Sequence, residues 1–154
     1  MAKEIERKFL VKNSSWKSDL QGILCRQGYL AKNEDITVRV RIIGDHAYLT
    51  IKGNTHGISR DEFEYEISMD DAEIMLRTMS HKGIVEKIRY KVEAEGLIWD
   101  VDEFLGDNKG LIMAEVELQS EGQQIVLPEW VGKEVTADIR FYNFYLAAHP
   151  FTKW

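Results

Sequence analysis

The first side chains whose types and spacing could do chemistry are Glu4, Glu6 and Lys8, which lie two residues apart. Side chains alternate across a β-strand, so these three would share one face, with Ile5 and Phe9 on the other. Carboxylates can ligate a hard divalent cation, and an ammonium can bind a phosphate oxygen. The spacing therefore predicts a strand with one charged face suited to chemistry and one apolar face.

The same division into a charged and an apolar face recurs along the later alternating stretches. On the charged faces, the basic residues are Arg39, Arg41, Lys52, Lys87, Arg89 and Lys91, and the acidic residues are Glu62, Glu64, Glu66, Asp100, Asp102, Glu115 and Glu117. In a single antiparallel strand the ordinary interpretation is a polar face turned to water. Runs of one charge sign weaken that interpretation, because like charges on adjacent strands repel unless a bound ion lies between them.

A closed barrel would explain these runs of charge. If the strands close, the charged face can point inward and the apolar face outward, under helices. Carboxylates on the inside suit Mg²⁺ or Mn²⁺, whereas arginine and lysine suit phosphate oxygens. A polyphosphate that chelates a metal needs both kinds of lining.

Hydrophobic periodicity predicts eight strands and three helices. The strands are expected at about 3–11, 24–32, 36–43, 46–52, 61–67, 84–94, 97–104 and 112–119, and the helices at about 14–22, 69–82 and 136–148. The links Gly44-Asp45 and Glu95-Gly96 predict tight antiparallel hairpins. The predicted fold class is α+β and β-dominated: an eight-stranded antiparallel closed barrel with a charged interior and helices packed outside.

Composition limits the class of protein. A chain of 154 residues with 44% apolar residues suits a single domain spanning 1–154. The formal net charge of −6 argues against a partner that is nucleic acid or a membrane surface. Cys25 is the only cysteine, which excludes disulfides within the chain and thiolate zinc clusters. Because no secretion signal or apolar run of membrane-spanning length is present, we expect a cytoplasmic protein.

Taken together, the ordered motifs resemble those of the triphosphate tunnel metalloenzymes, also called the CYTH superfamily. The hallmark Glu-x-Glu-x-Lys is matched at 4–8. The motifs that follow it are Arg26-Gln27-Gly28-Tyr29-Leu30, Arg39-Val40-Arg41, Leu49-Thr50-Ile51-Lys52, Arg60-Asp61-Glu62-Phe63-Glu64, Glu86-Lys87-Ile88-Arg89-Tyr90, Asp102-Glu103-Phe104, Glu115-Val116-Glu117 and Asp138-Ile139-Arg140-Phe141. The resemblance spans nearly the whole chain.

The resemblance implies a tunnel that binds a triphosphate together with Mg²⁺ or Mn²⁺. By matching positions, the phosphate-binding residues would be Lys8, Arg39, Arg41, Lys52, Lys87, Arg89 and Arg140. The leading metal ligands would be Glu4, Glu6, Glu115 and Glu117, with Glu62, Glu64 and Asp102 as lesser candidates. Tyr29 falls where a residue of the family helps to close the tunnel, and the catalytic set would be Glu4, Glu6, Lys8, Lys52 and Tyr29.

The implied activity is metal-dependent hydrolysis of a triphosphate, with inorganic tripolyphosphate giving diphosphate and phosphate as the leading hypothesis. Thiamine triphosphatase, nucleoside triphosphatase and class IV adenylate cyclase share the same lining and stay open as alternatives. A polyphosphate-binding module without turnover is a further alternative, which the retained carboxylate pairs disfavour. The general base is not identifiable from sequence. A homodimer is an expectation from the resemblance alone.

Overall fold

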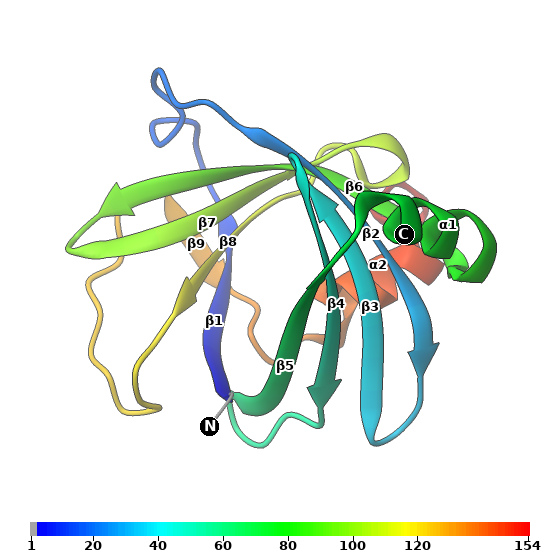
Figure 1. The fold of residues 1–154 in the computed structure, drawn as a ribbon. Coiled ribbons are helices and arrows are strands. Elements are labelled where there is room, and N and C mark those ends of the chain that lie inside the picture. Colours follow the sequence, from blue (N-terminus) through cyan, green and yellow to red (C-terminus); the bar gives the residue numbers. More distant parts are fainter. Residues whose placement is uncertain (1–2) are drawn as a thin grey trace.

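The structure is a computed structural model that describes residues 3–154, and it is dominated by one antiparallel sheet of nine strands (Figure 1). The strands are β1 (Lys3–Val11), β2 (Ile23–Lys32), β3 (Ile36–Ile43), β4 (His46–Gly53), β5 (Ser59–Ile67), β6 (His81–Ala94), β7 (Leu97–Phe104), β8 (Ile112–Glu117) and β9 (Val131–Glu134). The α-helices are α1 (Met69–Met79) and α2 (Asn143–Ala148), and the short 3₁₀ helices are η1 (Gly106–Asn108), η2 (Ile139–Phe141) and η3 (Phe151–Lys153).

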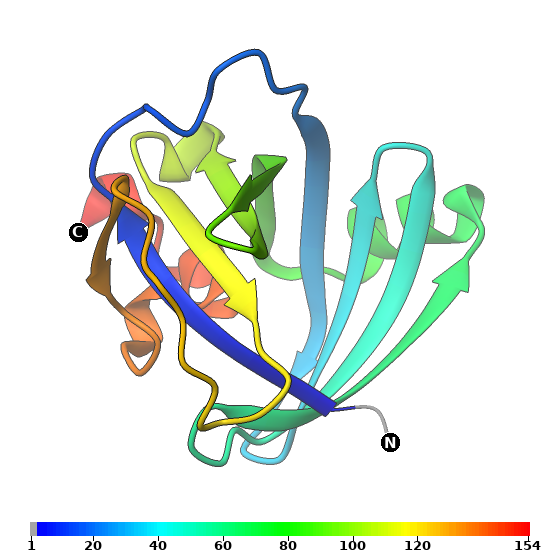
Figure 2. The same cartoon turned by 90° about the vertical axis from the view of Figure 1, so that its left-hand side faces the viewer.

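The sheet closes into a barrel through β1. Its order is β5-β4-β3-β2-β6-β7-β8-β1-β9, and β1 pairs with β5 as well. One edge of β1 pairs with β8, while the other edge is shared by β5 near the start of the strand and by β9 near its end. Figure 2 shows β1 running beside β8 from the amino-terminal end of the chain. The predicted β-dominated closed barrel is confirmed.

Both predicted hairpins are present. β3 and β4 pair in register from Ile43 with His46 back to Ile36 with Gly53, so the intervening turn is tight. In the turn between β6 and β7, Glu95 and Gly96 have φ angles of 52° and 77°. Two successive residues with positive φ match the right-handed twist of the flanking strands. These turns fix the registers that line up the inward side chains.

The outward faces of β1, β7 and β8 build the larger core. Trp99 has no exposed surface and packs against Phe9 and Trp130, with ring centroids 5.7 Å away in each case. Trp16 covers the same cluster from the loop after β1 and contacts Tyr90 at 5.0 Å. The apolar backs of these charged strands are therefore packed under loops.

α1 covers the outside of β2, β3 and β4, as Figure 1 shows on the right-hand side. The Ser68 side chain accepts a hydrogen bond from the backbone N–H of Asp71, which caps the first turn. The buried side of the helix, Ala72 and Leu76, packs on Val40 of β3 and its neighbours. The helix ends at Met79, three residues earlier than predicted, because β6 already begins at His81.

α2 lies at one end of the barrel. At that end the inward positions of β6, β7 and β8 change from charged to apolar, with Val85, Phe104 and Met113. Phe141 and Leu146, from η2 and α2, pack on them. The charged interior is therefore bounded on one side by an apolar cluster.

Three details differ from the prediction. The helix predicted at 14–22 is a series of turns, because the Asn13 side chain accepts a hydrogen bond from the Ser15 backbone and only Trp16, not Leu20, is buried. The helix predicted at 136–148 is divided at the extended residue Tyr142. β9 was not predicted, since four residues carry too short an alternation.

Among residues 3–154, no helix combines the length and apolar character that crossing a membrane requires.

Candidate functional site

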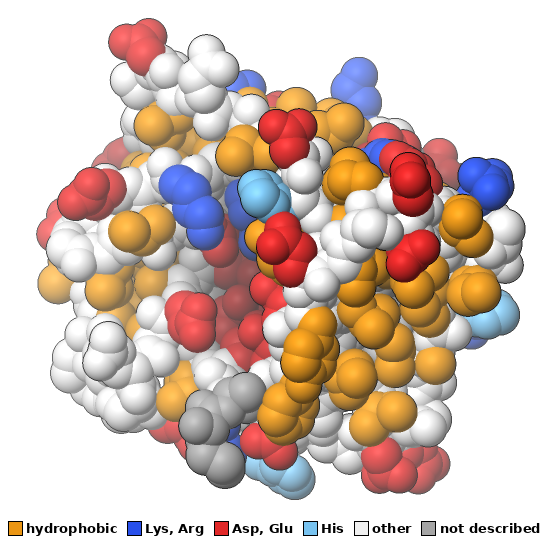
Figure 3. All heavy atoms as spheres, viewed as in Figure 1, with side chains coloured by type: hydrophobic (Ala, Val, Ile, Leu, Met, Phe, Trp, Pro, Cys, Tyr) orange, Lys and Arg blue, Asp and Glu red, His pale blue; other side chains and the backbone are white. Residues whose placement is uncertain are grey.

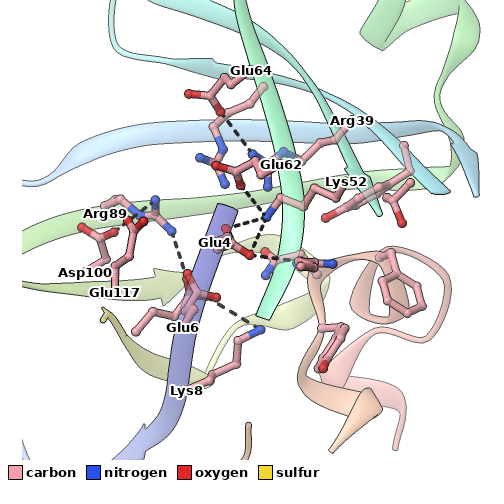
Figure 4. A pocket seen from close by; sticks show the side chains of 18 of the residues that line it. Glu4, Glu6, Lys8, Arg39, Lys52, Glu62, Glu64, Arg89, Asp100 and Glu117 are labelled. Carbon is pink, nitrogen blue, oxygen red and sulfur yellow. Dashed lines mark hydrogen bonds and ion pairs between the residues drawn. The ribbon is translucent and has the colours of Figure 1, made fainter. Parts of the chain in front are cut away.

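A charged cavity of about 170 Å³ lies inside the barrel. Its acidic lining is Glu4, Glu6, Glu62, Glu64, Asp100, Glu115 and Glu117, and its basic lining is Lys8, Arg39, Arg41, Lys52, Arg60, Lys87 and Arg89. Figure 3 shows carboxylates inside a hollow near the centre of one face, and Figure 4 shows the side chains converging from several strands. Acidic and basic groups balance, so the site suits a ligand that itself combines anions and cations.

Glu4 lies at the centre of one group of ion pairs. Lys52 Nζ is 3.1 Å from Glu4 Oε2 and 3.2 Å from Glu62 Oε2, and Arg60 Nε donates to Glu4 Oε1 at 3.0 Å. Burial alone would raise the pKa of Glu4, but the positive charge of Lys52, aided by Arg60, outweighs it and lowers the pKa well below its usual range. Burial raises the pKa of Glu62, and its hydrogen bond with Glu4 raises the pKa further by favouring the protonated form.

Asp102 anchors two cations in the opposite wall. Arg89 donates from Nε and Nη2 to the two carboxylate oxygens, both at 2.8 Å, and Lys87 Nζ lies 2.9 Å from Oδ2. Burial acts to raise the pKa of Asp102, but the charges of Arg89 and Lys87 lower it far below the usual value. Lys87 also donates to Asn143 Oδ1 at 3.0 Å. Asp102 has no exposed surface and stands behind these cations, outside the lining of the cavity.

Lys8 links the cavity to the carboxyl-terminal segment. Its Nζ donates to the Phe141 carbonyl at 3.1 Å, lies 4.8 Å from the centre of the Tyr142 ring and is 3.8 Å from Glu115 Oε1. Burial would raise the pKa of Glu115, but the charges of Lys8 and Arg89 lower it to about 2. Glu115 is therefore ionised across the physiological pH range.

Arg39 has an unused donor. Its Nη2 donates to Thr50 Oγ1 at 3.3 Å, and Thr50 Oγ1 in turn donates to Glu64 Oε2 at 2.9 Å. The buried Nε of Arg39 has no hydrogen-bond partner in the part of the chain that the structure describes. Burial, followed by repulsion from Arg41, lowers the pKa of Arg39. A buried donor without an acceptor is unfavourable, and a phosphate oxygen in the cavity would satisfy it.

Glu6 and Glu117 form the part of the cavity with too much negative charge. They face each other across β1 and β8 in the antiparallel register. Burial, then repulsion from Glu115 and Glu4, raises the pKa of Glu6 well above its usual value. Burial also raises the pKa of Glu117, with Glu4 adding to the effect. A divalent cation would relieve this repulsion, and the oxygen donors fit Mg²⁺ or Mn²⁺.

The carboxylates of the cavity have the right chemistry for a divalent metal, but they are not arranged as a complete set of ligands. Within the described residues, no three acidic, histidine or cysteine side chains already converge to the spacing of a metal site. The contacts of Glu4 give the reason, because its oxygens are bound by Lys52 and Arg60. An incoming cation would have to compete with these basic groups for carboxylate oxygens.

The barrel brings together almost all of the residues selected from the sequence. The residues that line the cavity as expected are Lys8, Tyr29, Arg39, Arg41, Lys52, Lys87, Arg89, Glu4, Glu6, Glu62, Glu64, Glu115 and Glu117. Asp102, expected as a lesser metal ligand, lies directly behind the lining, and both of its carboxylate oxygens contact cations.

The structure does not bring Arg140 to the lining of the cavity, where it was expected to bind phosphate. The Asp138 carboxylate accepts from Arg140 Nε at 3.1 Å and from Arg140 Nη2 at 2.7 Å, and the Arg140 side chain is 52% exposed. Its guanidinium also lies 5.4 Å from the Trp154 ring centre. Capping of η2 by Asp138 holds Arg140 on the surface.

Arg60 is the cation that the sequence reasoning missed. It lines the cavity at the point where β5 pairs with β1. The predicted strand began one residue later, at 61, so Arg60 was not assigned to a face. Had the alternation been extended backward from Glu64 and Glu62, it would have placed Arg60 on the same face.

The chain matches the CYTH domain family over residues 2–144. It is 48% identical to an inorganic triphosphatase of Acetivibrio thermocellus, with 98% of this chain and 97% of the relative covered. Its identity to an inorganic triphosphatase of Nitrosomonas europaea is 38%, covering 94% of this chain and 96% of the relative. The crystal structure of the inorganic triphosphatase NE1496 is similar over 96% of each chain, with a TM-score of 0.69 and 36% identity.

Proposed function

This chain belongs to the CYTH domain family, and we propose that it hydrolyses inorganic triphosphate to diphosphate and phosphate inside the charged cavity. The observation that carries the proposal is the size and lining of that cavity. At about 170 Å³ it is smaller than the range of about 300–1,000 Å³ common for organic ligands. The cavity is lined by seven basic side chains, which suit phosphate oxygens, and by seven carboxylates, which suit a divalent cation. A triphosphate bound to a metal is a compact ligand that combines both kinds of charge.

The basic side chains would hold the phosphates. Arg39 offers a buried donor that has no acceptor within residues 3–154, and arginine binds phosphate oxygens through a planar fork. Lys8 and Lys52 offer point charges from opposite sides of Glu4 and Glu6. The remaining cations of this set are Arg41, Lys87, Arg89 and Arg60.

The metal would be Mg²⁺ or Mn²⁺, held by carboxylates on β1 and β8. Glu6 and Glu117 are the leading ligands because burial and repulsion from other carboxylates raise the pKa of each, and a bound cation would offset that repulsion. Glu4 and Glu115 would complete the site, with Glu62 and Glu64 at its edge. When bound, the metal would neutralise phosphate charge and lower the pKa of a bound water.

The chain's own residues would act mainly by position and charge. In the reaction a water oxygen bonds to a terminal phosphorus, the bond from that phosphorus to its bridging oxygen breaks, and diphosphate leaves. Charge that grows on the bridging oxygen would be stabilised by preorganised cations such as Lys8 and Lys52. Asp102 would contribute by holding Arg89 and Lys87 in place.

An organic triphosphate is the second candidate, and a specific observation favours it. A cavity of about 350 Å³ lies beside Tyr29 and Phe144, with Tyr145 and Lys32 also in its wall. The Tyr29 and Phe144 rings, 6.4 Å apart, lie between this space and the tunnel. A nucleoside or thiamine group would need these rings to separate, which is why inorganic triphosphate is the first choice.

Phosphate release tests both candidates. Tripolyphosphate, ATP and thiamine triphosphate are each assayed with Mg²⁺, with Mn²⁺ and with excess chelator, and cyclic AMP is measured alongside. The proposal expects metal-dependent release, fastest from tripolyphosphate. Cyclic AMP formation would instead support a cyclase. Binding without turnover of any triphosphate would support a binding module and overturn the hydrolase.

The homodimer is also a proposal, and an exposed hydrophobic face supports it. On the outside of β3 and β5, beyond the cover of α1, Ile36, Phe63 and Tyr65 are 41%, 46% and 57% exposed. Figure 3 shows hydrophobic side chains gathered on the right-hand side of the face in view. A second copy of the chain would bury them. Light scattering should give the mass of a dimer for the native chain and of a monomer for Phe63→Lys. A monomer at all concentrations of the native chain would exclude it.

A further inference from the structure

Gln27 is buried between two residues of the charged cavity. β2 turns Gln27 and Tyr29 toward the interior, and Gln27 lies opposite Arg41 in the register with β3. Both polar atoms of its side chain are in use: Arg41 Nε donates to Oε1 at 3.1 Å, and Nε2 donates to the Tyr29 hydroxyl oxygen at 3.1 Å. A single buried amide thus joins a phosphate-binding cation to a hydroxyl group.

Arg41 determines which way that amide faces. A guanidinium has donors only, so the amide atom opposite Arg41 Nε has to be the carbonyl oxygen. The Cys25 thiol, a weak donor, contacts the same oxygen at 3.6 Å. The NH₂ group of Gln27 consequently faces Tyr29, and because NH₂ can only donate, the tyrosine hydroxyl accepts.

The Tyr29 hydroxyl therefore keeps its own proton for another partner. No hydrogen bond among residues 3–154 uses that proton, although Tyr29 lines the cavity opposite Arg39. A phenolic hydroxyl that accepts on one side donates on another, and here the available side is the cavity. An anion held by Arg39 and Arg41 would lie within its reach.

We propose that Gln27 is a positioning residue, which holds Arg41 and directs the Tyr29 hydroxyl proton toward an oxygen of the bound triphosphate. The inference rests on the proposed function, because it requires a triphosphate in the cavity. Gln27 itself does not touch the substrate, since Arg41 and Tyr29 occupy its polar atoms. Its effect passes through the hydrogen bond from Tyr29, a neutral donor whose bond strengthens as charge grows on the phosphate.

Gln27→Glu separates this role from a general structural one. The glutamate has nearly the same shape and still accepts from Arg41, but it cannot donate to Tyr29. It would instead accept the tyrosine proton and turn it away from the substrate. In the native background, Tyr29→Phe should lower kcat/KM about 10- to 100-fold, the range for a hydrogen bond to a charged group. In the Gln27→Glu background, Tyr29→Phe should change kcat/KM by less than about twofold.

The comparison of backgrounds removes the effect of the added charge. Gln27→Glu places a carboxylate near the anion, which lowers activity by itself, but that penalty is the same with and without the Tyr29 hydroxyl. The exposed Gln124→Glu is the matched control, and in that background Tyr29→Phe should have its full effect. Melting curves confirm that each variant is folded. Should Gln27→Glu not fold, Gln27→Met replaces it, because methionine also cannot donate to Tyr29.

A second measurement distinguishes failure of this inference from failure of the proposed function. The dissociation constant of tripolyphosphate is measured by calorimetry, in the presence of chelator, for four proteins. These are the native chain, Tyr29→Phe, Gln27→Glu and the double variant. Loss of the Tyr29→Phe effect in the Gln27→Glu background, in kcat/KM or in binding, supports the positioning role. An equal effect in both backgrounds overturns it while leaving a triphosphatase intact. A native protein that neither binds nor hydrolyses a triphosphate overturns both.

Discussion

At the scale of single residues, Asp102 offers the clearest test of how the cavity wall is held. Its side chain is buried and bonds both Arg89 and Lys87. Asp102→Ala would leave two buried cations without their partner, which typically costs about 3–5 kcal/mol. Urea unfolding in chelator should show a loss of that size. The matched change Asp61→Ala, whose pair with Lys3 is more than half exposed on both sides, should cost no more than about 1 kcal/mol.

Replacing Glu6 should raise the stability of the fold, whereas replacing Asp102 should lower it. Burial and repulsion raise its pKa in the folded chain, so the folded state binds the proton more tightly than the unfolded state does. Ionisation of Glu6 therefore reduces stability as the pH rises above its usual carboxyl value of 4.5. In chelator at pH 7, Glu6→Gln should unfold at higher urea concentration than the native protein. The gain should fade as the pH falls toward that usual value.

Two results would contradict this account of Glu6. One is a variant that is less stable than the native chain at pH 7 in chelator. The other is a gain that is equal at acidic and neutral pH, since a packing effect does not titrate. Added Mg²⁺ should stabilise the native protein more than it stabilises Glu6→Gln, because the variant has lost a carboxylate ligand.

At the scale of elements, alternation in sequence was enough to predict which faces of the strands turn inward. In the strands that carry Glu4, Arg39 and Glu115, charged residues alternate with apolar residues. The two kinds of side chain therefore lie on opposite faces, and the charged face lines the cavity. The carboxyl-terminal region was harder. The hydrophobic spacing of Phe141 and Leu146 is real, and both are buried, but Asp138 caps a separate 3₁₀ turn and leaves Arg140 outside.

The packing of α1 on β2 gives a prediction at this scale. Gly28 lies beneath the end of the helix, and a Cβ there would come within 2.1 Å of Ser80 Oγ and 3.1 Å of Leu76 Cδ2. Gly28→Ala should force the Ser80 hydroxyl to rotate and shift the end of the helix slightly, at a cost of about 1–3 kcal/mol, as overpacking does. The control is Gly122→Ala, where a Cβ would meet nothing within 4 Å. Equal unfolding midpoints for the two variants would show that α1 is not seated on β2 as described.

At the scale of the whole molecule, closure of the barrel turns separate charged strands into one site. Contacts made by closure could not be predicted, because they join segments far apart in the chain. The bond from Arg60 to Glu4 across the closure is one example, and the bond from Lys87 of β6 to Asn143 of α2 is a long-range contact of the same kind. The link from Gln27 to Arg41 also depends on a register that the sequence does not state. What the sequence predicted was the chemistry of the interior, not its network of partners.

The balance of charge inside the barrel also differs from the charge of the chain. The molecule carries a formal net charge of −6, yet the cavity lining has as many basic as acidic side chains. An anion would therefore be attracted by local contacts rather than by the overall field. A site for a metal-bound triphosphate requires basic and acidic side chains together in the cavity, whatever the net charge of the molecule.

The most direct measurement of the central claim is metal-dependent phosphate release from tripolyphosphate by two variants measured side by side. Glu117→Ala removes a carboxylate from the cavity, whereas Arg140→Ala removes an arginine that the structure places on the surface. We predict that Glu117→Ala lowers kcat by about 100-fold or more while remaining folded, and that Arg140→Ala keeps the native rate within about twofold. Native activity in Glu117→Ala, or its loss in Arg140→Ala, would contradict the assignment of catalysis to this cavity.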